Sequence, residues 1–392
     1  MATALGSTQK RGITIKMTNI NESVGNFKPN AEGNYISYGL RSLSGISYDF
    51  IQKIIENRPF KTFEEFMIKT EPNKAQALAL IKAGAFQEID SQNRKLTLAK
   101  YAKFTTNKRK NLTIAQLPIL ISAGLLPEEL EKEKRVYEFN RYIKEILIKS
   151  GEVIRLDERA QNFLVALGAE LLMTPLGEWV VMGQDGWKKY YDSSMVPVRE
   201  FLKSNKPDLL QNIFLIEMFE LFDEYGGEES LGRWEMESMN FYYTEHELKN
   251  LDYKTYGISK YGSLPREPKK QNLGRYSIFD LSIIVGTIIG KNKVKGTLDL
   301  LTPEGDVVLI KMYKGDFSFW DKQISEQDGS GKKTVVEKSF FVRGNKLLLT
   351  GFRRNDQFIP RTYASSPSPK IGLITELKED GSITMKTGRA VS

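Results

Sequence analysis

The spacing of apolar residues divides the chain into a helical part followed by a part rich in strands. Between Gly39 and about Thr106, apolar residues recur every three or four positions in YDFIQKIIENR, KTFEEFMIKT, KAQALALIKAG and RKLTLAKYAKF. This spacing predicts four short helices with tight connections. Helical spacing continues to about Leu251, whereas beyond residue 277 apolar and polar residues alternate with a period of two, which predicts strands.

Five strands are predicted in this last part, joined by turns rich in Gly, Asn and Asp. They lie in LSIIVGTIIGKN, KGTLDLLTPEGD, VVLIKMYKGD, SFFVRGNKLLLTGFRRND and QFIPRTYAS. A short helical piece, FSFWDKQI, separates the third from the fourth, and the hairpin IGLITELKEDGSITMK follows the fifth. Five strands with a helix after the third is the order of the oligonucleotide/oligosaccharide-binding (OB) barrel.

We therefore expect an α+β protein of several domains. Residues 1–37 form a lead-in strand and loops, 38–106 a tandem helix-hairpin-helix domain, and 107–256 a helical insertion or connector. Residues 257–277 are predicted to be a linker because Gly, Pro, Ser and Lys are dense there, and 278–392 to be the OB barrel with its C-terminal hairpin.

Two glycine-bearing turns in the helical part are candidate anion sites. In YGLRSLSGISYDFIQKII, residues 38–55, the backbone amides of Gly45, Ile46 and Ser47 lie between two apolar runs, and Lys82 and Gly84 hold matching places in LIKAGAF. Glycine permits the required dihedral angles and a close approach of the backbone to a phosphate. An ordinary glycine turn of a small helical core would have the same pattern, so both interpretations stay open.

Composition narrows the possible partners and chemistry. The 57 basic and 49 acidic residues give a net charge of +8, which suits a polyanion such as nucleic acid or serves solubility alone. The absence of cysteine excludes disulfides and thiolate zinc sites, and His246 is the sole histidine. No stretch approaches the ~18 uncharged apolar residues of a membrane span, and the N-terminus has no signal-peptide core, so we expect a soluble, non-exported protein.

Basic and aromatic residues are interleaved in the predicted barrel. Such barrels bind single strands by base stacking and basic grooves. The candidates for DNA contact are Lys311, Tyr313, Lys314, Arg353 and Arg354, together with the basic run Lys108, Arg109 and Lys110 before the insertion. Phe317, Phe319 and Trp320 are expected to pack in the barrel core instead.

Two blocks of the sequence resemble the alpha subunit of bacterial DNA polymerase III, in its phage-type form. The first runs from KRGITIKMTNINES through YISYGLRSLSGISYDFIQKI and FKTFEEF to LIKAGAFQEI, and the second is RWEMESMNFYYTEHEL. The resemblance implies the end of the fingers, the tandem helix-hairpin-helix region and the OB domain. Ser44 and Ser47 stand where that family prefers Lys and Gly, so we expect the second hairpin, around Lys82 and Gly84, to bear much of the grip on DNA.

The carboxylate cluster with which that family holds catalytic magnesium is absent from this chain, so no catalytic residue and no metal or cofactor site is predicted here. The resemblance implies a separate chain that carries the palm and Mg²⁺, with this chain gripping duplex and single-stranded DNA in the cytoplasm of a bacterium or a phage-infected host. A sliding clamp is a further candidate partner. The alternatives are a stand-alone nucleic-acid-binding accessory protein and a protein-interaction module.

Overall fold

The computed structural model describes residues 11–150, 154–166, 171–173, 179–181, 183–273, 276–327, 333–364 and 368–390, with residues 5, 8, 177 and 366. It divides into two compact units. The first contains Met1–Leu98 and Gly226–Ser392, and the second contains Ala99–Tyr225. The second unit is thus an insertion in the sequence of the first.

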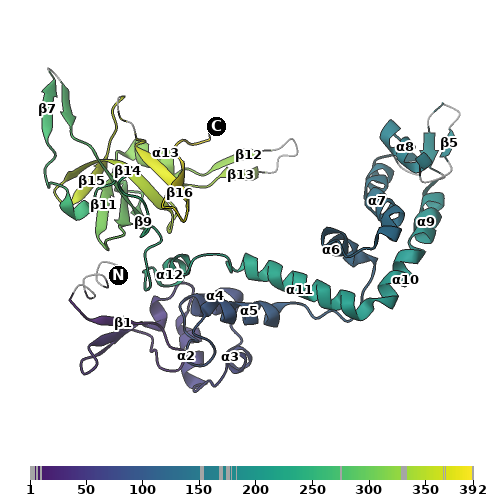
Figure 1. Ribbon diagram of the computed structural model, residues 1–392, viewed down its shortest axis with the longest axis horizontal. Coiled ribbons are helices and arrows are strands. Elements are labelled where there is room, and N and C mark those ends of the chain that lie inside the picture. The colour runs from purple at the N-terminus through teal and green to yellow at the C-terminus, as the bar shows by residue number, and fades with distance from the viewer. Residues whose placement is uncertain are drawn as a thin grey trace. The chain divides into compact units, whose positions relative to one another are not determined.

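The N-terminal part of the first unit is a small sheet followed by short helices (Figure 1). The sheet has the order β1 (Thr14–Lys16), β3 (Tyr35–Ser37), β2 (Lys28–Asn30). A 3₁₀ turn, η1 (Leu40–Ser42), precedes α2 (Tyr48–Glu56), α3 (Phe63–Thr70), α4 (Lys74–Lys82) and α5 (Arg94–Thr105). The four helices predicted from the apolar spacing are therefore confirmed.

Polar caps fix where these helices begin, because the first amides of a helix have no partner inside it. Thr62 accepts a hydrogen bond from the Glu65 amide at the start of α3, while the Glu65 carboxylate accepts from the Lys61 amide. At α4, Asn73 and Gln76 form a complete capping box. Behind the caps, the core contains edge-to-face pairs of Phe60, Phe63, Phe66 and Phe86.

The C-terminal part of the first unit is a closed five-stranded barrel. Its strands are β9 (Ser282–Asn292), β10 (Thr297–Leu301), β11 (Val307–Lys311), β14 (Lys346–Arg354) and β15 (Gln357–Pro360), and α13 (Lys314–Asp321) follows β11. The order β15-β11-β10-β9-β14 closes because β14 also pairs with β15, and β11 and β15 run parallel. The predicted OB topology is confirmed.

Two further pieces extend the barrel (Figure 1). The predicted C-terminal hairpin is β16 (Ile371–Leu377) and β17 (Ile383–Lys386), and β16 pairs with β14. The hairpin of β12 (Ile324–Gln327) and β13 (Lys333–Glu337) lies between α13 and β14. Phe317 is 2% exposed in the core and Trp320 packs against it, as expected, whereas Phe319 is 55% exposed, so the core prediction is wrong for Phe319.

The segment predicted to be a linker is part of the barrel. Within residues 257–277, a 3₁₀ turn, η4 (Tyr261–Ser263), places Tyr261 and Leu264 in the barrel core, and Ile258 bridges to Ile283. β7 (Lys270–Leu273) pairs with β8 (Tyr276–Phe279) as a hairpin. The linker prediction failed because a few apolar side chains anchor a segment whose composition is otherwise typical of a loop.

The second unit is mainly helical. It contains η2 (Ile114–Gln116), α6 (Leu117–Ser122), η3 (Glu128–Leu130), α7 (Glu131–Ser150), α8 (Glu158–Ala166), α9 (Gly183–Ser194), α10 (Val196–Ser204) and α11 (Lys206–Glu224), with a small sheet of β4 (Ile154–Arg155), β6 (Trp179–Val181) and β5 (Leu171–Met173). Trp187, Val198 and Ile213 belong to its core. No described helix is long and apolar enough to cross a membrane.

A helix and its closing turn occur twice in the chain. NKAQALALIKAGAF (73–86) and TIAQLPILISAGLL (113–126) share an Ala-Gln pair near the start and a Leu-Ile-x-Ala-Gly ending. Both begin with a capping box and end in a glycine of positive φ, Gly84 or Gly124. In the first turn the amides of Gly84 and Ala85 donate to the carbonyls of Ile81 and Leu80. In the second, the amides of Gly124 and Leu125 donate to the carbonyls at the same positions, Ile121 and Leu120. Because sequence and hydrogen bonds agree, we regard the two stretches as one repeated structural element, in which the glycine supplies the left-handed residue after the helix.

Candidate functional site

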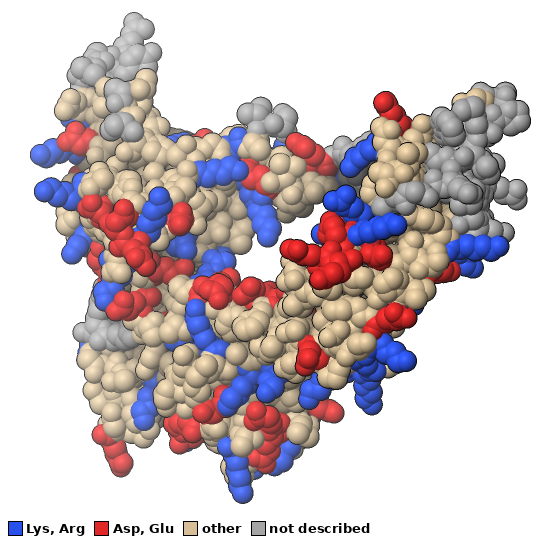
Figure 2. All heavy atoms as spheres, turned by 45° about the vertical axis from the view of Figure 1, so that its right-hand side comes forward, with Lys and Arg blue, Asp and Glu red and all other residues tan. Residues whose placement is uncertain are grey.

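Basic and acidic side chains are interspersed on the face of the molecule shown in Figure 2. The net charge of +8 therefore does not by itself point to one basic patch on that face. The predicted contact residues differ instead in their own partners and exposure, as described below for each group.

The first hairpin, Leu43–Ser47, joins η1 to α2. Gly45 has φ +80°, and a Cβ atom built there would lie no closer than 4.0 Å to the Ala75 Cβ. Glycine is thus needed for its dihedral angle and not for lack of space. The Ser44 amide donates to the Ser238 carbonyl of α12 (Leu231–Met239), which fixes one edge of the hairpin.

The next three amides of this hairpin are available to a ligand. Gly45 and Ser47 are exposed and Ile46 is partly exposed, and within the described residues their N–H groups have no hydrogen-bond acceptor. Ser47 is the N-cap of α2, and its hydroxyl accepts from the Phe50 amide. Free amides beside the positive end of a helix dipole favour an anion such as a phosphate.

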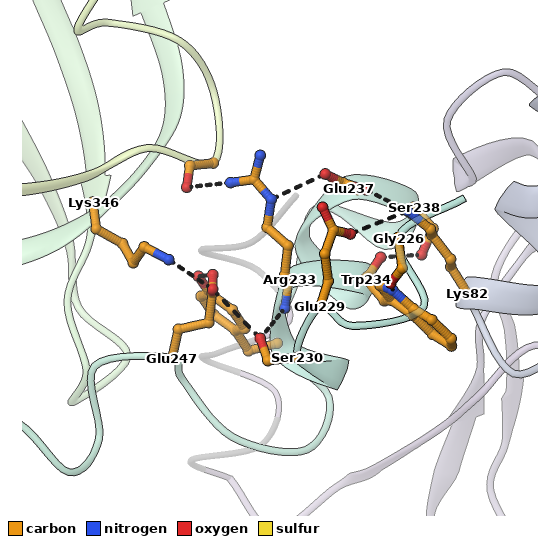
Figure 3. Close-up of polar contacts among 12 residues, drawn as sticks. Lys82, Gly226, Glu229, Ser230, Arg233, Trp234, Glu237, Ser238, Glu247 and Lys346 are labelled. Atoms are coloured by element: carbon orange, nitrogen blue, oxygen red, sulfur yellow. Dashed lines mark hydrogen bonds and ion pairs between the residues drawn. The ribbon is translucent and has the colours of Figure 1, made fainter. Parts of the chain in front are cut away.

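The second hairpin differs from the first, because its backbone amides and its lysine already have partners within the chain. The amides of Gly84 and Ala85 donate to the Ile81 and Leu80 carbonyls. Lys82 is only 11% exposed, and its Nζ lies 2.8 Å from Glu237 and 3.3 Å from Glu229 (Figure 3). The second hairpin, which we expected to bear much of the grip on DNA, therefore has fewer available donors than the first.

The pairing of Lys82 is one end of a polar network that continues to the barrel (Figure 3). Arg233 donates from Nε to Glu237 at 2.9 Å and from a terminal nitrogen to the Gly344 carbonyl at 2.9 Å. Glu247 pairs with Lys346 of β14 at 2.7 Å. Arg233 thus links α12 and the helix-hairpin-helix part to the barrel, and Glu247, in the turn that follows α12, adds a second contact with the barrel.

A buried ion pair supports the same connection. Arg94 at the start of α5 is 2.7 Å from Glu235 of α12, and the two side chains are 4% and 0% exposed. Arg94 also donates to the Lys82 carbonyl, and the second Glu235 oxygen accepts from the Tyr243 and Thr244 amides. Sequence reasoning missed this pair. The signal was a carboxylate flanked directly by Trp234 and Met236 in an amphipathic helix.

The single histidine, His246, has a structural role in the turn after α12. His246 is 9% exposed; its Nδ1 accepts from the Leu248 amide at 3.0 Å and its Nε2 lies 3.1 Å from the Leu301 carbonyl of β10. The tautomer protonated at Nε2 satisfies both contacts. Burial lowers the pKa of His246 to about 4, so the ring is neutral at pH 7. It fastens the turn after α12 to the barrel.

This attachment covers part of the outer barrel surface. Met236 and Tyr242 pack against Leu301, with Ile289 and Val307 beside them. Strands β10 and β11 correspond to the second and third OB strands, whose outer face commonly binds ligands in this fold. Here the chain itself occupies the end of that face near Leu301 and Val307.

The opposite end, at the β9–β10 and β11–α13 loops, is accessible. Tyr313 is 79% exposed and Val294 is 90% exposed. Lys311 donates to the Lys295 carbonyl, and Lys314 is exposed at the start of α13. Lys293, 70% exposed although paired to Asp321, adds another ammonium group at this end of the barrel.

The predicted arginines of the barrel differ in their surroundings. Arg353 donates to the carbonyls of Tyr261, Leu264 and Asn355 and lies over the Tyr261 ring, so it secures the 261–264 segment. Arg354 is exposed and lies 5.7 Å from the Phe352 ring centroid. Arg354 thus keeps donors for a phosphate, whereas those of Arg353 are directed at the backbone.

The basic run at 107–110 lies in the second unit. Lys108 and Lys110 are exposed, but Arg109 pairs with Glu217 of α11 at 2.5 Å. Of the three, the two lysines are thus the more accessible to a ligand. Among the described residues, no group of three or more His, Asp or Glu side chains could hold a metal ion.

Fold and site together define a class of protein: helix-hairpin-helix elements joined through a polar network to an OB barrel. In a comparison with protein families, the family of the helix-hairpin-helix motif matches residues 12–96 of this chain. Over its whole length the chain is 32% identical to a probable DNA polymerase, YorL, of Bacillus subtilis (strain 168) and to a DNA-directed DNA polymerase of Bacillus phage SPbeta. It spans 31% of the length of each of these relatives.

A shorter match reaches the DNA polymerase III alpha subunit of Staphylococcus aureus (strain MRSA252), at 37% identity over 92 residues. These are 22% of this chain and 8% of that subunit. The chain is therefore similar over its whole length to part of two DNA polymerases, one of them from a phage, and over a shorter stretch to the DNA polymerase III alpha subunit.

Proposed function

We propose that this chain is the DNA-binding portion of a polymerase of the DNA polymerase III alpha kind. It holds duplex DNA through the first hairpin and single-stranded template at the open end of the barrel. The observation that carries the proposal concerns the amides of Gly45, Ile46 and Ser47, within the region that matches the helix-hairpin-helix motif: they belong to exposed or partly exposed residues and have no acceptor among the described residues.

The duplex contact follows from the chemistry of these amides. Backbone N–H groups bind phosphate oxygens without reading bases, which suits a protein that must move along any sequence. Ser44 ties the hairpin to α12, and α12 is tied to the barrel by Arg233. A force that bound DNA exerts on the hairpin is therefore transmitted to the barrel through hydrogen bonds.

The single-strand contact is assigned to the open end of the barrel because the other end of the outer face is covered by Tyr242 and Met236. Tyr313 offers a ring for base stacking, and Lys295, Lys311 and Lys314 supply positive charge for the backbone. Arg354, Lys108 and Lys110 are additional phosphate contacts in this proposal.

Phosphoryl transfer in this proposal belongs to a palm that contributes the magnesium carboxylates. The test is to combine the purified chain with a palm-bearing polymerase chain and measure nucleotide incorporation on a primed template. Incorporation that requires both chains supports the proposal. DNA binding that persists with no effect on any palm-bearing chain would instead indicate a stand-alone accessory protein.

A charge placed at the first hairpin tests the duplex contact. Gly45→Asp is expected to weaken binding of a blunt duplex about tenfold and to flatten the dependence of affinity on salt, because phosphate contacts are lost. The measurement is fluorescence anisotropy of a labelled duplex over a range of salt concentrations.

Gly305→Asp is the matched control, because Gly305 has φ +85° and open space around it, as Gly45 does, but lies in the β10–β11 turn. The control has the same backbone strain and the same added charge. Equal affinities of the two variants would refute the hairpin assignment.

The barrel contact is tested by removing the exposed ring. Tyr313→Ala is expected to weaken binding of a single-stranded oligonucleotide by roughly 1–3 kcal/mol while leaving blunt-duplex affinity unchanged, since a stacked base loses its platform. The readout is anisotropy with both DNAs. Phe219→Ala, which removes another exposed ring (59% exposed) from α11, should leave single-strand binding unaffected.

A further inference from the structure

Strands β14 and β15 carry aromatic and basic side chains on the outside of the barrel. Phe358 of β15 belongs to the barrel core, so the next residue, Ile359, points outward. Phe352 of β14 lies opposite Ile359 in the register and therefore points outward as well. The hydrogen-bonded ladder continues to Arg361. Since alternate residues of a strand share a face, Arg354 and Arg361 flank this outward pair at its two ends.

A ring from the preceding hairpin packs on this face and contacts both arginines. Phe279 is the last residue of β8, in the hairpin that projects from the barrel, and its ring centroid lies 4.7 Å from that of Phe352 (Figure 1). The guanidinium carbons of Arg354 and Arg361 each lie 5.8 Å from the Phe279 centroid, within the range of cation–π attraction. Because both distances are measured from one centroid, the two guanidinium groups are no more than about 12 Å apart.

The Phe279 ring is held in place by a hydrogen bond as well as by packing. Its backbone amide donates to the Tyr363 hydroxyl at 2.7 Å. Arg361 lies over the Tyr363 ring too, 5.4 Å from its centroid. Contacts with fixed rings restrict the long arginine side chains, so less conformational entropy remains to be lost when a ligand binds. The two guanidinium groups are thus oriented in the free protein.

The hydrogen-bond donors of both arginines are available to a ligand. Arg354 and Arg361 are exposed, and within the part of the chain that the structure describes neither side chain forms a hydrogen bond or an ion pair. Asp280 and Asp356, the nearest carboxylates in sequence, are exposed and pair with neither of them. Arg353, in contrast, donates to three backbone carbonyls. The face therefore keeps two oriented cations whose donors are directed at solvent.

The spacing and the position of the two arginines suit a chain of phosphates. A guanidinium donates two parallel hydrogen bonds to phosphate oxygens, and phosphates recur along a DNA strand every ~3.4 Å of helix axis, so one strand can reach both groups. The face also adjoins the open end of the barrel. β11 and β15 are parallel neighbours, and Tyr313 and Arg361 follow their C-terminal ends. A strand stacked on Tyr313 can thus continue along β15.

We propose that the outer face of β14 and β15 binds the sugar-phosphate backbone of a DNA single strand, with Arg354 and Arg361 contacting phosphates on either side of Phe279. The proposal rests on the DNA-binding function proposed above and extends the single-strand contact from the open end of the barrel to a second face. Phe279 is a positioning residue, because it orients the two guanidinium groups.

The test is fluorescence anisotropy of the full chain with a labelled oligodeoxythymidylate over a range of salt concentrations. Each phosphate contact with a single strand contributes about 0.7 to the slope of log affinity against log salt concentration. Arg354→Gln/Arg361→Gln is therefore expected to make the slope less steep by about 1.4.

The matched control is Lys254→Gln/Lys378→Gln. It removes the same charge from two exposed lysines, one in the β16–β17 turn and one in the segment 252–257, which is hydrogen-bonded to that turn. The control should leave the single-strand slope unchanged, and the slope for a blunt duplex should be the same in both double variants.

Phe279→Leu separates positioning from charge. Both guanidinium groups are retained, so the salt slope is expected to stay the same while affinity for the oligodeoxythymidylate falls about two- to fivefold, because the arginines lose the ring that orients them. A cooperative thermal transition verifies that the variant is folded. Unchanged affinity of this folded variant would refute the positioning role.

Three results would overturn the assignment of the face. These are equal single-strand slopes in the arginine and lysine variants, an equal change of slope for the duplex and the single strand, and binding of poly-L-glutamate as tight as that of the oligonucleotide and dependent on the same arginines, which would indicate an acidic protein partner. A chain that binds duplex DNA but is indifferent to the two arginines refutes only this inference. A chain that binds neither DNA refutes the proposed function as well.

Discussion

Glu235→Gln is expected to lower the free energy of unfolding by about 3–5 kcal/mol, the largest effect that we predict for this chain. The substitution leaves the Arg94 guanidinium, 4% exposed, without its 2.7 Å carboxylate partner. The uncompensated charge cannot reach water, because Arg94 lies between the Lys82 carbonyl and α12. The amides of Tyr243 and Thr244 also lose an ionised acceptor for a neutral one.

Chemical denaturation followed by tryptophan fluorescence measures this loss, since Trp234 neighbours the substituted residue. The control is Glu245→Gln, which breaks an ion pair with Lys249 whose members are both 59% exposed. That change should cost no more than about 1 kcal/mol. In the double variant Arg94→Met/Glu235→Met the loss should be much smaller than the sum of the single losses, because no charge stays buried alone. A Glu235→Gln loss as small as that of Glu245→Gln would show that the pair is not buried in solution.

Stability is expected to fall as the pH drops from 7.5 to 5, by about 2 kcal/mol through His246 alone. The pKa of the buried ring is lowered from 6.5 in an unfolded chain to about 4, chiefly by burial. The unfolded state therefore binds a proton in this range while the folded state does not. The contribution of the neutral His246 ring to the free energy of unfolding is fully present above pH 6.5 and is lost as the pH falls toward 4.

The measurement compares unfolding free energies of the unmodified chain and His246→Gln at several pH values. Glutamine keeps a donor for the Leu301 carbonyl but has no proton to gain. The variant should be less stable at pH 7.5, because the Leu248 amide loses its acceptor, and should have a flatter pH dependence down to pH 5. Glu247 and Lys346 lie near the ring, and both are retained in the comparison. Parallel pH profiles would rule out His246 as the titrating group.

Local features of the fold were predictable from the sequence, because they depend on neighbouring residues. Helical spacing and the Thr62 cap located α3, and period-two alternation located the five barrel strands and the final hairpin. The helix after the third strand completed the OB order. Each of these signals acts over fewer than about twenty residues, within the range of backbone hydrogen bonding and side-chain periodicity.

The candidate site was less predictable, because its character depends on distant partners. Lys82 was chosen as a phosphate contact, yet Glu229 and Glu237, which neutralise it, lie 147 and 155 residues further along the chain. Arg353 was chosen beside a turn, but Tyr261 and Leu264 take its hydrogen bonds. The first hairpin is predicted to be the weaker one because it lacks lysine, although among the described residues its three amides have no acceptor and are the more available donors. Charge counts along the sequence do not show which charges are already paired.

The position of the inserted unit has a consequence for synthesis of the protein on the ribosome. Arg94 and Glu235 are 141 residues apart, and the whole of Ala99–Tyr225 is made between them. At bacterial elongation rates this interval is on the order of ten seconds. During that time α5 carries a cation without its carboxylate, and the first hairpin lacks the Ser238 carbonyl that holds Ser44. The nascent helix-hairpin-helix part therefore reaches its final stability only after the inserted unit has been synthesised and α12 has docked.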